Sequence, residues 1–360
     1  TEQGDLLLVG AQAPIRYDVP RLRLRIAEEP YKSALLNIMR MSTLEGLLGH
    51  YLADSAFTQA IARSEGPRLN TDDHTEAEFA FARSSGSSAH LDLKALMELA
   101  HARQQDRPAL SGEPIDWEQV AARRISMFTL TGAPAPVPLY LSASQMERAR
   151  LHLGYTRGDF AGALGIALSL AWEPSDLVEL SMFADLLVKG QDARAREYIE
   201  RLRSLQPSEA DALDGLWHLQ RREIPEAAAA LQSAFRRFHD DPWPSHQIMR
   251  RALRAVPELL AQDKTQAQPF YQSLATAFAV YELNEERLGQ LINVAAVLDD
   301  TVHCSDALRQ LGPHILWQET LLRWRLSCYR NIGQTRLAAA AERDLEDFLR
   351  HQPTSVVQGL

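Results

Sequence analysis

Hydrophobic residues recur at intervals of three and four positions along most of this chain, a spacing that predicts amphipathic helices. In the first part the pattern covers residues 31–40 and 43–63. Further on, we expect a helix over residues 91–104 and another that begins at Asp116, a good capping residue. From residue 144 onward nearly every segment follows the same spacing. The pattern therefore predicts a mainly α protein.

Three short stretches near the N-terminus break the helical spacing. Residues 5–9 form an apolar run between glycines, which predicts a buried strand. Residues 76–81 alternate polar and apolar positions after an acidic turn, which predicts a second strand with one buried face. The sequence "RLRLR" at residues 21–25 also alternates. We expect it to form a short exposed link, because its arginine side chains need solvent.

Two stretches of unusual composition mark the boundaries between parts of the chain. The sequence "SSGSS" at residues 84–88 predicts a flexible linker, and "TGAPAPVP" further on predicts a rigid connector. We divide the chain into four parts on this basis. They are the end of an α/β domain (1–83), a linker and helical connector (84–143), helical repeats (144–243), and degenerate helical hairpins with a last repeat unit (244–360).

The third part contains an internal repeat. Ala163, Ala195 and Ala227 recur every 32 residues, each shortly after a helix break. Each unit then ends near a proline: Pro174, Pro207 or Pro242. A small residue lets two antiparallel helices approach closely, and a proline stops the second helix before the next unit begins. The repeat therefore predicts a row of helix-turn-helix hairpins.

These hairpins resemble the tetratricopeptide repeat (TPR). The matching positions are Gly158-Asp159-Phe160 with Ala163, Gly190 with Ala195 and Pro207, Gly215 with Ala227 and Ala234, and Gly333, Ala338, Leu345 and Pro353 near the C-terminus. The period is about two residues shorter than the ~34 of that family, and its first-helix aromatic residue is absent. Residues 245–330 also depart from the pattern. The resemblance implies a TPR-like solenoid with a concave surface for a protein partner, and a generic helical solenoid is the alternative.

Composition limits the classes of partner and of site. The 360 residues include 38 Lys and Arg against 47 Asp and Glu, and the net charge of −9 argues against nucleic-acid binding, which needs a clustered basic face. The longest apolar runs are much shorter than the ~20 residues of a membrane span. Cys304 and Cys328 lack the spaced pairs of a zinc site or a disulfide framework. We expect both to be small core residues, and we expect no metal site.

Residues 4–83 resemble the closing part of the spermidine synthase-like fold, in particular bacterial proteins in which it is fused to membrane helices. The matching residues are Gly4-Asp5-Leu6-Leu7-Leu8-Val9-Gly10, then Leu69-Asn70-Thr71-Asp72-Asp73, and then Glu78, Phe79 and Arg83. His74 and Thr75 stand where that family usually has a basic residue and a proline. The resemblance implies the truncated end of an α/β methyltransferase-like domain, with two strands and two or more helices.

The same resemblance implies which catalytic parts are missing. Family members bind a decarboxylated S-adenosylmethionine-type nucleotide through a Gly-rich loop and use an Asp to accept a proton from the attacking amine. This sequence has no Gly-rich strand-to-helix loop, so we expect both parts to lie upstream of Thr1 in a longer parent protein. This chain would then hold no cofactor and no catalytic residue. The resemblance implies that the parent lies at the cytoplasmic face of a membrane and is attached to it by segments that this chain lacks.

Two groups of residues are candidates for binding. Asn70, Thr71, Asp72 and Asp73 could attract a cationic amine near a substrate cleft, but a capped turn that leads into a strand is the favoured explanation. In the repeats, aromatic residues between Trp217 and Trp324 are mostly expected in the core. A groove for a partner could be lined by Arg250, Arg251, Arg254, Trp243 and Arg323, with solvated helix faces as the alternative.

Two functions follow from this sequence. The first is a protein-interaction region of a spermidine synthase-like protein, which is not catalytic alone and which could also form a homo-oligomer. The second is a part of an active aminopropyltransferase of polyamine biosynthesis, whose nucleotide-binding half lies upstream of this chain.

Overall fold

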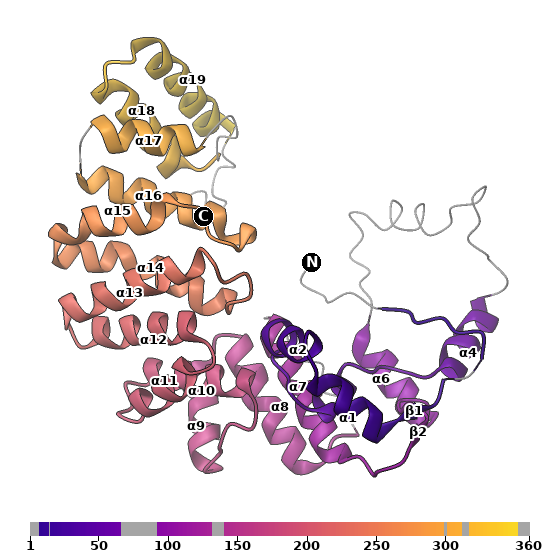
Figure 1. Ribbon diagram of the computed structural model, residues 1–360. Coiled ribbons are helices and arrows are strands. Elements are labelled where there is room, and N and C mark those ends of the chain that lie inside the picture. The colour runs from indigo at the N-terminus through magenta and orange to yellow at the C-terminus, as the bar shows by residue number, and fades with distance from the viewer. Residues whose placement is uncertain are drawn as a thin grey trace, which may run out of the picture. The chain divides into compact units, whose positions relative to one another are not determined.

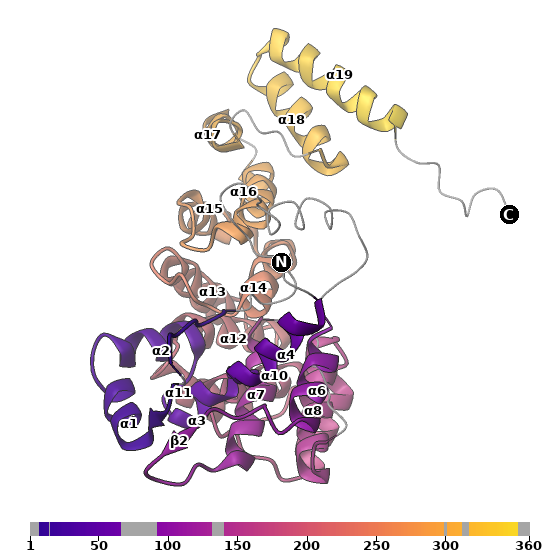
Figure 2. The same cartoon turned by 90° about the vertical axis from the view of Figure 1, so that its right-hand side faces the viewer.

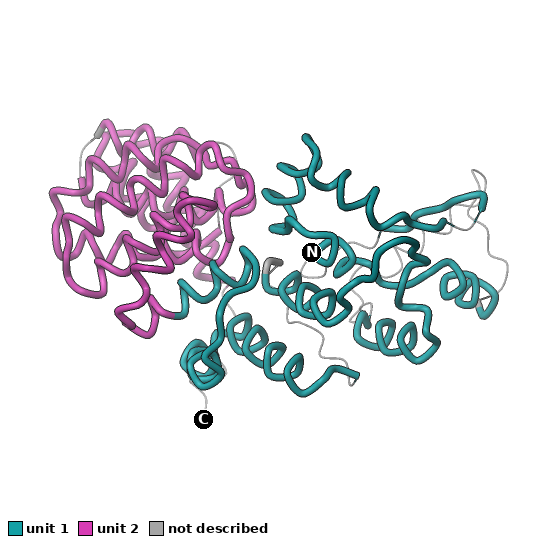
Figure 3. The backbone as a smooth tube through the Cα atoms, turned by 60° about the horizontal axis from the view of Figure 1, so that its bottom comes forward, with its two compact units in different colours: residues 1–186 teal, residues 187–360 magenta. Residues whose placement is uncertain are grey.

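The computed structural model divides the chain into two compact units, residues 1–186 and 187–360 (Figures 1 and 3). It describes residues 7–13, 15–65, 92–131, 140–298, 301–311 and 317–351. Within these ranges the chain is mainly helical, as the hydrophobic spacing predicts, and the strands β1 and β2 have two residues each. Among the described helices, none combines the length and the apolar character that crossing a bilayer requires.

Unit 1 contains short helices around a two-stranded parallel sheet in which Tyr17 pairs with Leu110 and Asp18 with Ser111. Its elements are β1 (Tyr17–Asp18), α1 (Val19–Ala27), α2 (Tyr31–Met39), α3 (Leu44–Gly49), α4 (Ser55–Glu65), α6 (Leu93–Ala102), β2 (Leu110–Ser111), α7 (Trp117–Thr131), α8 (Ala143–Thr156) and α9 (Phe160–Ser169). Helix α10 (Leu177–Lys189) follows.

Residues 21–25 lie inside α1, so the prediction of an exposed link is wrong. Asp18 caps this helix by accepting a hydrogen bond from the backbone N–H of Arg21 at 2.8 Å. Val19, Leu22 and Ile26 share one side of the helix and pack on the core formed with α3 and α7. The alternation of Arg and Leu over five residues resembled a strand, but the apolar spacing of three and four is helical.

The apolar run at residues 5–9 does not form a buried strand over its described part, so this prediction is also wrong. Leu7, Leu8 and Val9 belong to no strand and are exposed by 88%, 80% and 69%. A buried strand needs a hydrogen-bonded neighbour on each side, and β1 and β2 pair only with each other in the described sheet. The second predicted strand, at residues 76–81, lies outside the described residues.

The other helices of unit 1 follow the sequence more closely. The predicted helix over residues 43–63 is divided into α3 and α4, because Asp54 caps a new helix by accepting from the N–H of Phe57 at 2.9 Å. Asp116 caps α7 as predicted and accepts from the N–H of Gln119 at 3.1 Å. A polar side chain that satisfies the first N–H groups of a helix thus determines where these helices begin.

Unit 2 consists of helices that follow one another in pairs, and each pair has a first helix and a second helix. Its elements are α11 (Ala195–Arg203), α12 (Pro207–Gln220), α13 (Ile224–Phe238), α14 (His246–Gln262), η1 (Lys264–Gln266), α15 (Ala267–Ala275), η2 (Tyr281–Leu283), α16 (Asn284–Leu298), α17 (Thr301–Leu311), α18 (Glu319–Asn331) and α19 (Thr335–His351). We call α12, α14, α16 and α18 the first helices of unit 2.

The first helices contact one another in chain order, α12 with α14, α14 with α16, and α16 with α18. Within the first and last pairs, α12 packs on α13 and α18 packs on α19. Figure 2 shows α18 and α19 side by side, with a core of their own that includes Leu322, Leu326 and Leu345. Helix α15 packs on α16, the first helix of the next pair, so apolar faces are buried between pairs as well as within them.

The repeated alanines lie where the sequence predicts them, in second helices. Ala163, Ala195 and Ala227 are in α9, α11 and α13, and all three are buried. Close approach is clearest at Gly215 in α12, where a Cβ atom would lie 2.6 Å from Leu231 Cγ and 3.0 Å from the backbone N of Leu231 on α13. A backbone neighbour cannot move away as a side chain can, so this crossing of helices requires glycine.

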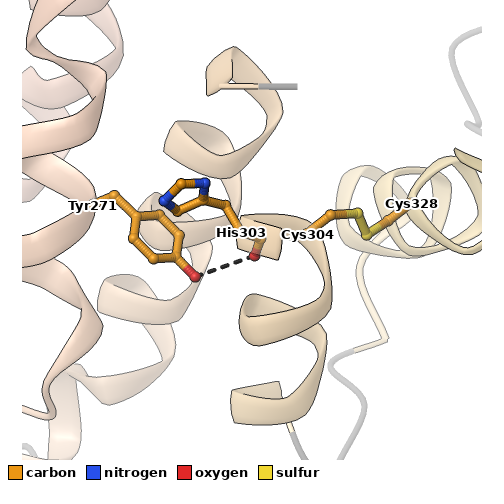
Figure 4. Close-up of a disulfide and its surroundings, with 4 residues drawn as sticks. All are labelled: Tyr271, His303, Cys304 and Cys328. Carbon is orange, nitrogen blue, oxygen red and sulfur yellow. Dashed lines mark hydrogen bonds between the residues drawn. A yellow bond between two sulfur atoms is a disulfide. The ribbon is translucent and has the colours of Figure 1, made fainter. Parts of the chain in front are cut away.

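Cys304 and Cys328 form a disulfide between α17 and α18, with Cα atoms 5.9 Å apart (Figure 4). Both are buried, as predicted, but the prediction of two separate core residues is wrong. The bond joins positions 24 residues apart. On the other side of α17, the hydroxyl of Tyr271 on α15 donates to the backbone carbonyl of His303 at 3.1 Å and to Asp306 at 2.8 Å. Helix α17 is thereby fixed on both sides.

We expect Gly215→Ala to lower the free energy of unfolding by about 1 to 3 kcal/mol, because the added methyl group overpacks the crossing of α12 and α13. Urea unfolding followed by circular dichroism measures the change. Gly289→Ala on α16 is the matched control, since no described atom lies within 4 Å of its added Cβ. There alanine should stabilise by up to about 1 kcal/mol through its helix propensity. Equal effects at the two sites would contradict the close approach.

Candidate functional site

The aromatic residues of unit 2 fall into two sets. The first set is buried, as predicted, and includes Phe235, Phe238, Phe270 and Phe278. Phe235 lies at the centre, with its ring centroid 6.3 Å from Phe238, 6.0 Å from Phe270 and 6.0 Å from Phe278. These rings join α13, α15 and the segment that precedes η2 into one core.

The second set of large apolar side chains lies on the surface, two or three residues before each first helix. Its members are Leu205, Trp243, Tyr281 and Trp317, exposed by 48%, 47%, 86% and 53%. They occur at intervals of 38, 38 and 36 residues. We call these four residues the junction row, because each lies at the junction between one helix pair and the next.

Hydrogen bonds between successive pairs bring these junctions next to one another. Glu209 on α12 accepts from the backbone N–H of Ser245, just before α14, at 2.7 Å. His246 Nδ1, at the start of α14, lies 3.2 Å from Glu282 Oε2, just before α16. The pattern continues at α18, where Gln318 donates to Glu285 of α16 at 2.7 Å. Each contact joins positions 33 or 36 residues apart, so the first helices run in the same direction with a nearly constant offset.

Acidic side chains lie beside two members of the junction row, Trp243 and Tyr281. Asp240 and Asp241 precede Trp243, and Glu282 and Glu285 follow Tyr281. Within the described part of the chain, none of these four carboxylates pairs with a lysine or arginine. Glu285 lies in the first turn of α16, where the helix dipole favours negative charge. The surface beside Trp243 and Tyr281 therefore carries negative charge.

Two of the four predicted groove arginines pair with neighbouring carboxylates. Arg250 on α14 donates to Glu286 on α16 at 2.9 Å, and Arg323 on α18 pairs with Glu319 one turn earlier at 2.7 Å. Arg254 is exposed and forms no ion pair with the described residues, whereas Arg251 is half-buried. Arg250 thus contributes to the contact between two first helices.

Of the predicted groove residues, Trp243 belongs to the junction row. Sequence reasoning did not identify Leu205 as a candidate, and it assigned Tyr281 and Trp317 mainly to the core. The signal that could have found them is their own interval of 36 to 38 residues, which differs from the 32-residue interval of the alanines.

The predicted acidic loop, Asn70, Thr71, Asp72 and Asp73, lies outside the described residues. Among the residues that are described, no group of three His, Cys, Asp or Glu side chains is placed to hold a metal ion. A pocket between α6 and α7, lined by Met97, Ile125, Phe128 and Tyr140 among others, has a volume of about 30 Å³. That volume accommodates a water molecule rather than a substrate.

An extensive cluster of buried polar side chains in unit 1 surrounds Glu179, in the first turn of α10. Its Oε1 accepts a hydrogen bond from Arg148 Nε at 2.5 Å and lies 3.4 Å from His152 Nε2. Its Oε2 accepts from the backbone N–H and the hydroxyl of Ser175 at 2.8 and 2.7 Å. Donors therefore surround both carboxylate oxygens.

The charge on Glu179 is strongly favoured. Burial raises the pKa of this carboxyl group, but the hydrogen bond with His152 and the positive charge of Arg148 outweigh burial and lower the pKa to about 2. The cluster extends to α7, where Arg123 donates to Asp176 at 2.7 Å. Because both carboxylate oxygens of Glu179 are occupied by protein donors, the cluster joins α8 to α10 and offers no open position for a ligand.

We expect Glu179→Gln to lower the free energy of unfolding by about 3 to 5 kcal/mol at pH 7, because it removes one member of a buried ion pair. The folded pKa of about 2 lies below the ordinary value of 4.5. The stability from this shift is therefore complete above the ordinary pKa and is lost as the pH falls toward 2. Urea unfolding between pH 7 and pH 3 measures both effects.

Glu147→Gln on α8 is the control for this prediction, because among the described residues Glu147 pairs only with the exposed Arg150 three residues later. We expect a change within about 0.5 kcal/mol for that variant, with the wild-type pH dependence. A Glu179→Gln protein that keeps the wild-type stability and its loss at acidic pH would contradict the role of the cluster.

Comparison with protein-family models, with curated proteins and with solved structures finds no match to this chain.

Proposed function

We propose that unit 2 is a TPR-like array of helical hairpins that binds a protein partner and has no catalytic activity of its own. The observation that carries this proposal is the nearly constant offset of 33 to 36 residues between hydrogen-bonded positions on successive first helices. Such an offset is expected of an array in which each pair of helices repeats the arrangement of the one before. An array of this kind forms an extended surface on which the same position recurs.

The surface composition supports binding of a protein over binding of a small molecule. The pocket between α6 and α7 has room for a water molecule only, and the described residues contain no metal cluster. They also expose a series of large apolar side chains, two of them tryptophans, along the junctions of unit 2. Tryptophan and tyrosine are enriched among the residues that contribute most to protein–protein binding energy.

We further propose that the array belongs to a spermidine synthase-like parent, on the resemblance of residues 4–83 alone. In that arrangement the partner would be brought to the transferase domain of the parent, which would supply the nucleotide site and the amine-activating Asp. The partner is a protein because an extended, repetitive surface suits an extended chain better than it suits a single small substrate.

Site-specific photo-crosslinking in the cells that produce the protein tests the proposal. We expect p-benzoylphenylalanine at Arg254 of α14 or at Arg323 of α18 to form an adduct with one discrete protein, since both positions are on exposed parts of first helices. Mass spectrometry identifies the adduct.

Exposed positions on second helices, Glu226 of α13 and Gln272 of α15, serve as controls and should give at most a few per cent of that adduct. Equal adducts at all four positions, or none at Arg254 and Arg323, would contradict binding at the first helices.

A further inference from the structure

The junction row is unusual because its exposed apolar side chains recur at the same place in successive helix pairs. Tyr281 is 86% exposed and Trp317 is 53% exposed. The ring of Trp317 stacks on Phe348 with centroids 6.4 Å apart, and the backbone N–H of Trp243 donates to Asp241 at 3.0 Å. Exposed aromatic side chains in a series are a feature of binding surfaces.

The spacing of the row sets a condition on the partner. Packed helices lie about 8 to 10 Å apart, so neighbouring members of the row are separated by roughly that distance. In an extended peptide of the polyproline II type, which has three residues per turn, positions i and i+3 share one face and lie about 9 Å apart. An extended segment with an apolar residue at every third position can therefore place one side chain on each member of the row.

The charge beside the row sets a second condition. Asp240 is exposed beside it, and Asp241, Glu282 and Glu285 are bonded to hydroxyl, backbone N–H, histidine and amide groups within the described chain. A second copy of this acidic chain, with its net charge of −9, would be repelled here. A cationic segment would be attracted.

We propose that the junction row, Leu205, Trp243, Tyr281 and Trp317, binds an extended basic peptide segment that carries an apolar residue at every third position. This inference rests on the proposed protein-binding function and assigns the class of partner and its site. The apolar side chains of the segment pack on the row, and its lysines or arginines pair with the carboxylates beside it.

Fluorescence anisotropy tests the proposal with a labelled decapeptide that has Leu at its first, fourth, seventh and tenth positions, with Lys and Ser between them. We expect the intact chain to bind it, and we expect the triple variant Trp243→Ser, Tyr281→Ser, Trp317→Ser to bind at least about tenfold more weakly. Replacing Lys by Glu in the peptide should weaken binding by a similar factor. The variant Asp240→Asn, Glu282→Gln, Glu285→Gln should reduce both the affinity and its dependence on salt.

The control variant Val302→Ser, Leu349→Ser changes two apolar residues of unit 2 that are exposed outside the row, and it should bind like the wild type. Thermal melts by circular dichroism establish that each variant is folded. Absence of peptide binding by the wild type, or equal binding by the triple variant, overturns this inference. The triple variant can also be tested for crosslinking at Arg254 and Arg323. An adduct with the same discrete protein as the wild type would overturn the assignment of the junction row as the binding site, while the proposed protein-binding function would stand.

Discussion

A single helical hairpin cannot bury its apolar face alone, and this constraint determines the organisation of unit 2. Small residues let the two helices of a pair pack closely, as at Gly215 of the first helix α12 against α13 and at the buried Ala227 of the second helix α13. Polar bonds such as that between Arg250 and Glu286 then fix each pair on the next. These bonds between successive pairs join residues that are 33 to 36 positions apart in the sequence. A given position in one hairpin therefore lies next to the corresponding position in the following hairpin. The junction row is a consequence of that repetition.

The sequence predicts the helices well because their apolar spacing and their caps are local signals. Asp116 and the repeated alanines occupy the places expected of them. One error occurs at residues 21–25, which fit both the alternation of a strand and the spacing of a helix. The helix forms because Val19, Leu22 and Ile26 share one apolar side. The disulfide was missed for another reason. Two cysteines 24 residues apart carry no signal of contact until α17 and α18 are placed side by side.

The candidate site could be predicted only in part. Trp243 was identified, but helical spacing alone cannot distinguish an aromatic residue in the core from one at a junction. Phe278 is buried and Tyr281, three residues later, is exposed. The arginines also gave a wrong indication of the groove. Arg250 and Arg323 were predicted to be available to a partner, but in the fold they pair with Glu286 and Glu319. Which side chains are available to a partner depends on contacts between residues more than thirty positions apart, and these cannot be obtained from a local pattern.

The central claim is that successive first helices lie side by side in the same direction and bring the junctions into one row. Electron–electron double resonance between nitroxide labels at positions 243 and 317, with the Cys304–Cys328 bond intact, tests it most directly. Two steps of about 10 Å predict a narrow distance distribution centred near about 20 Å. A broad distribution, or one centred beyond about 35 Å, would contradict the account, since the junctions would then not form a continuous surface.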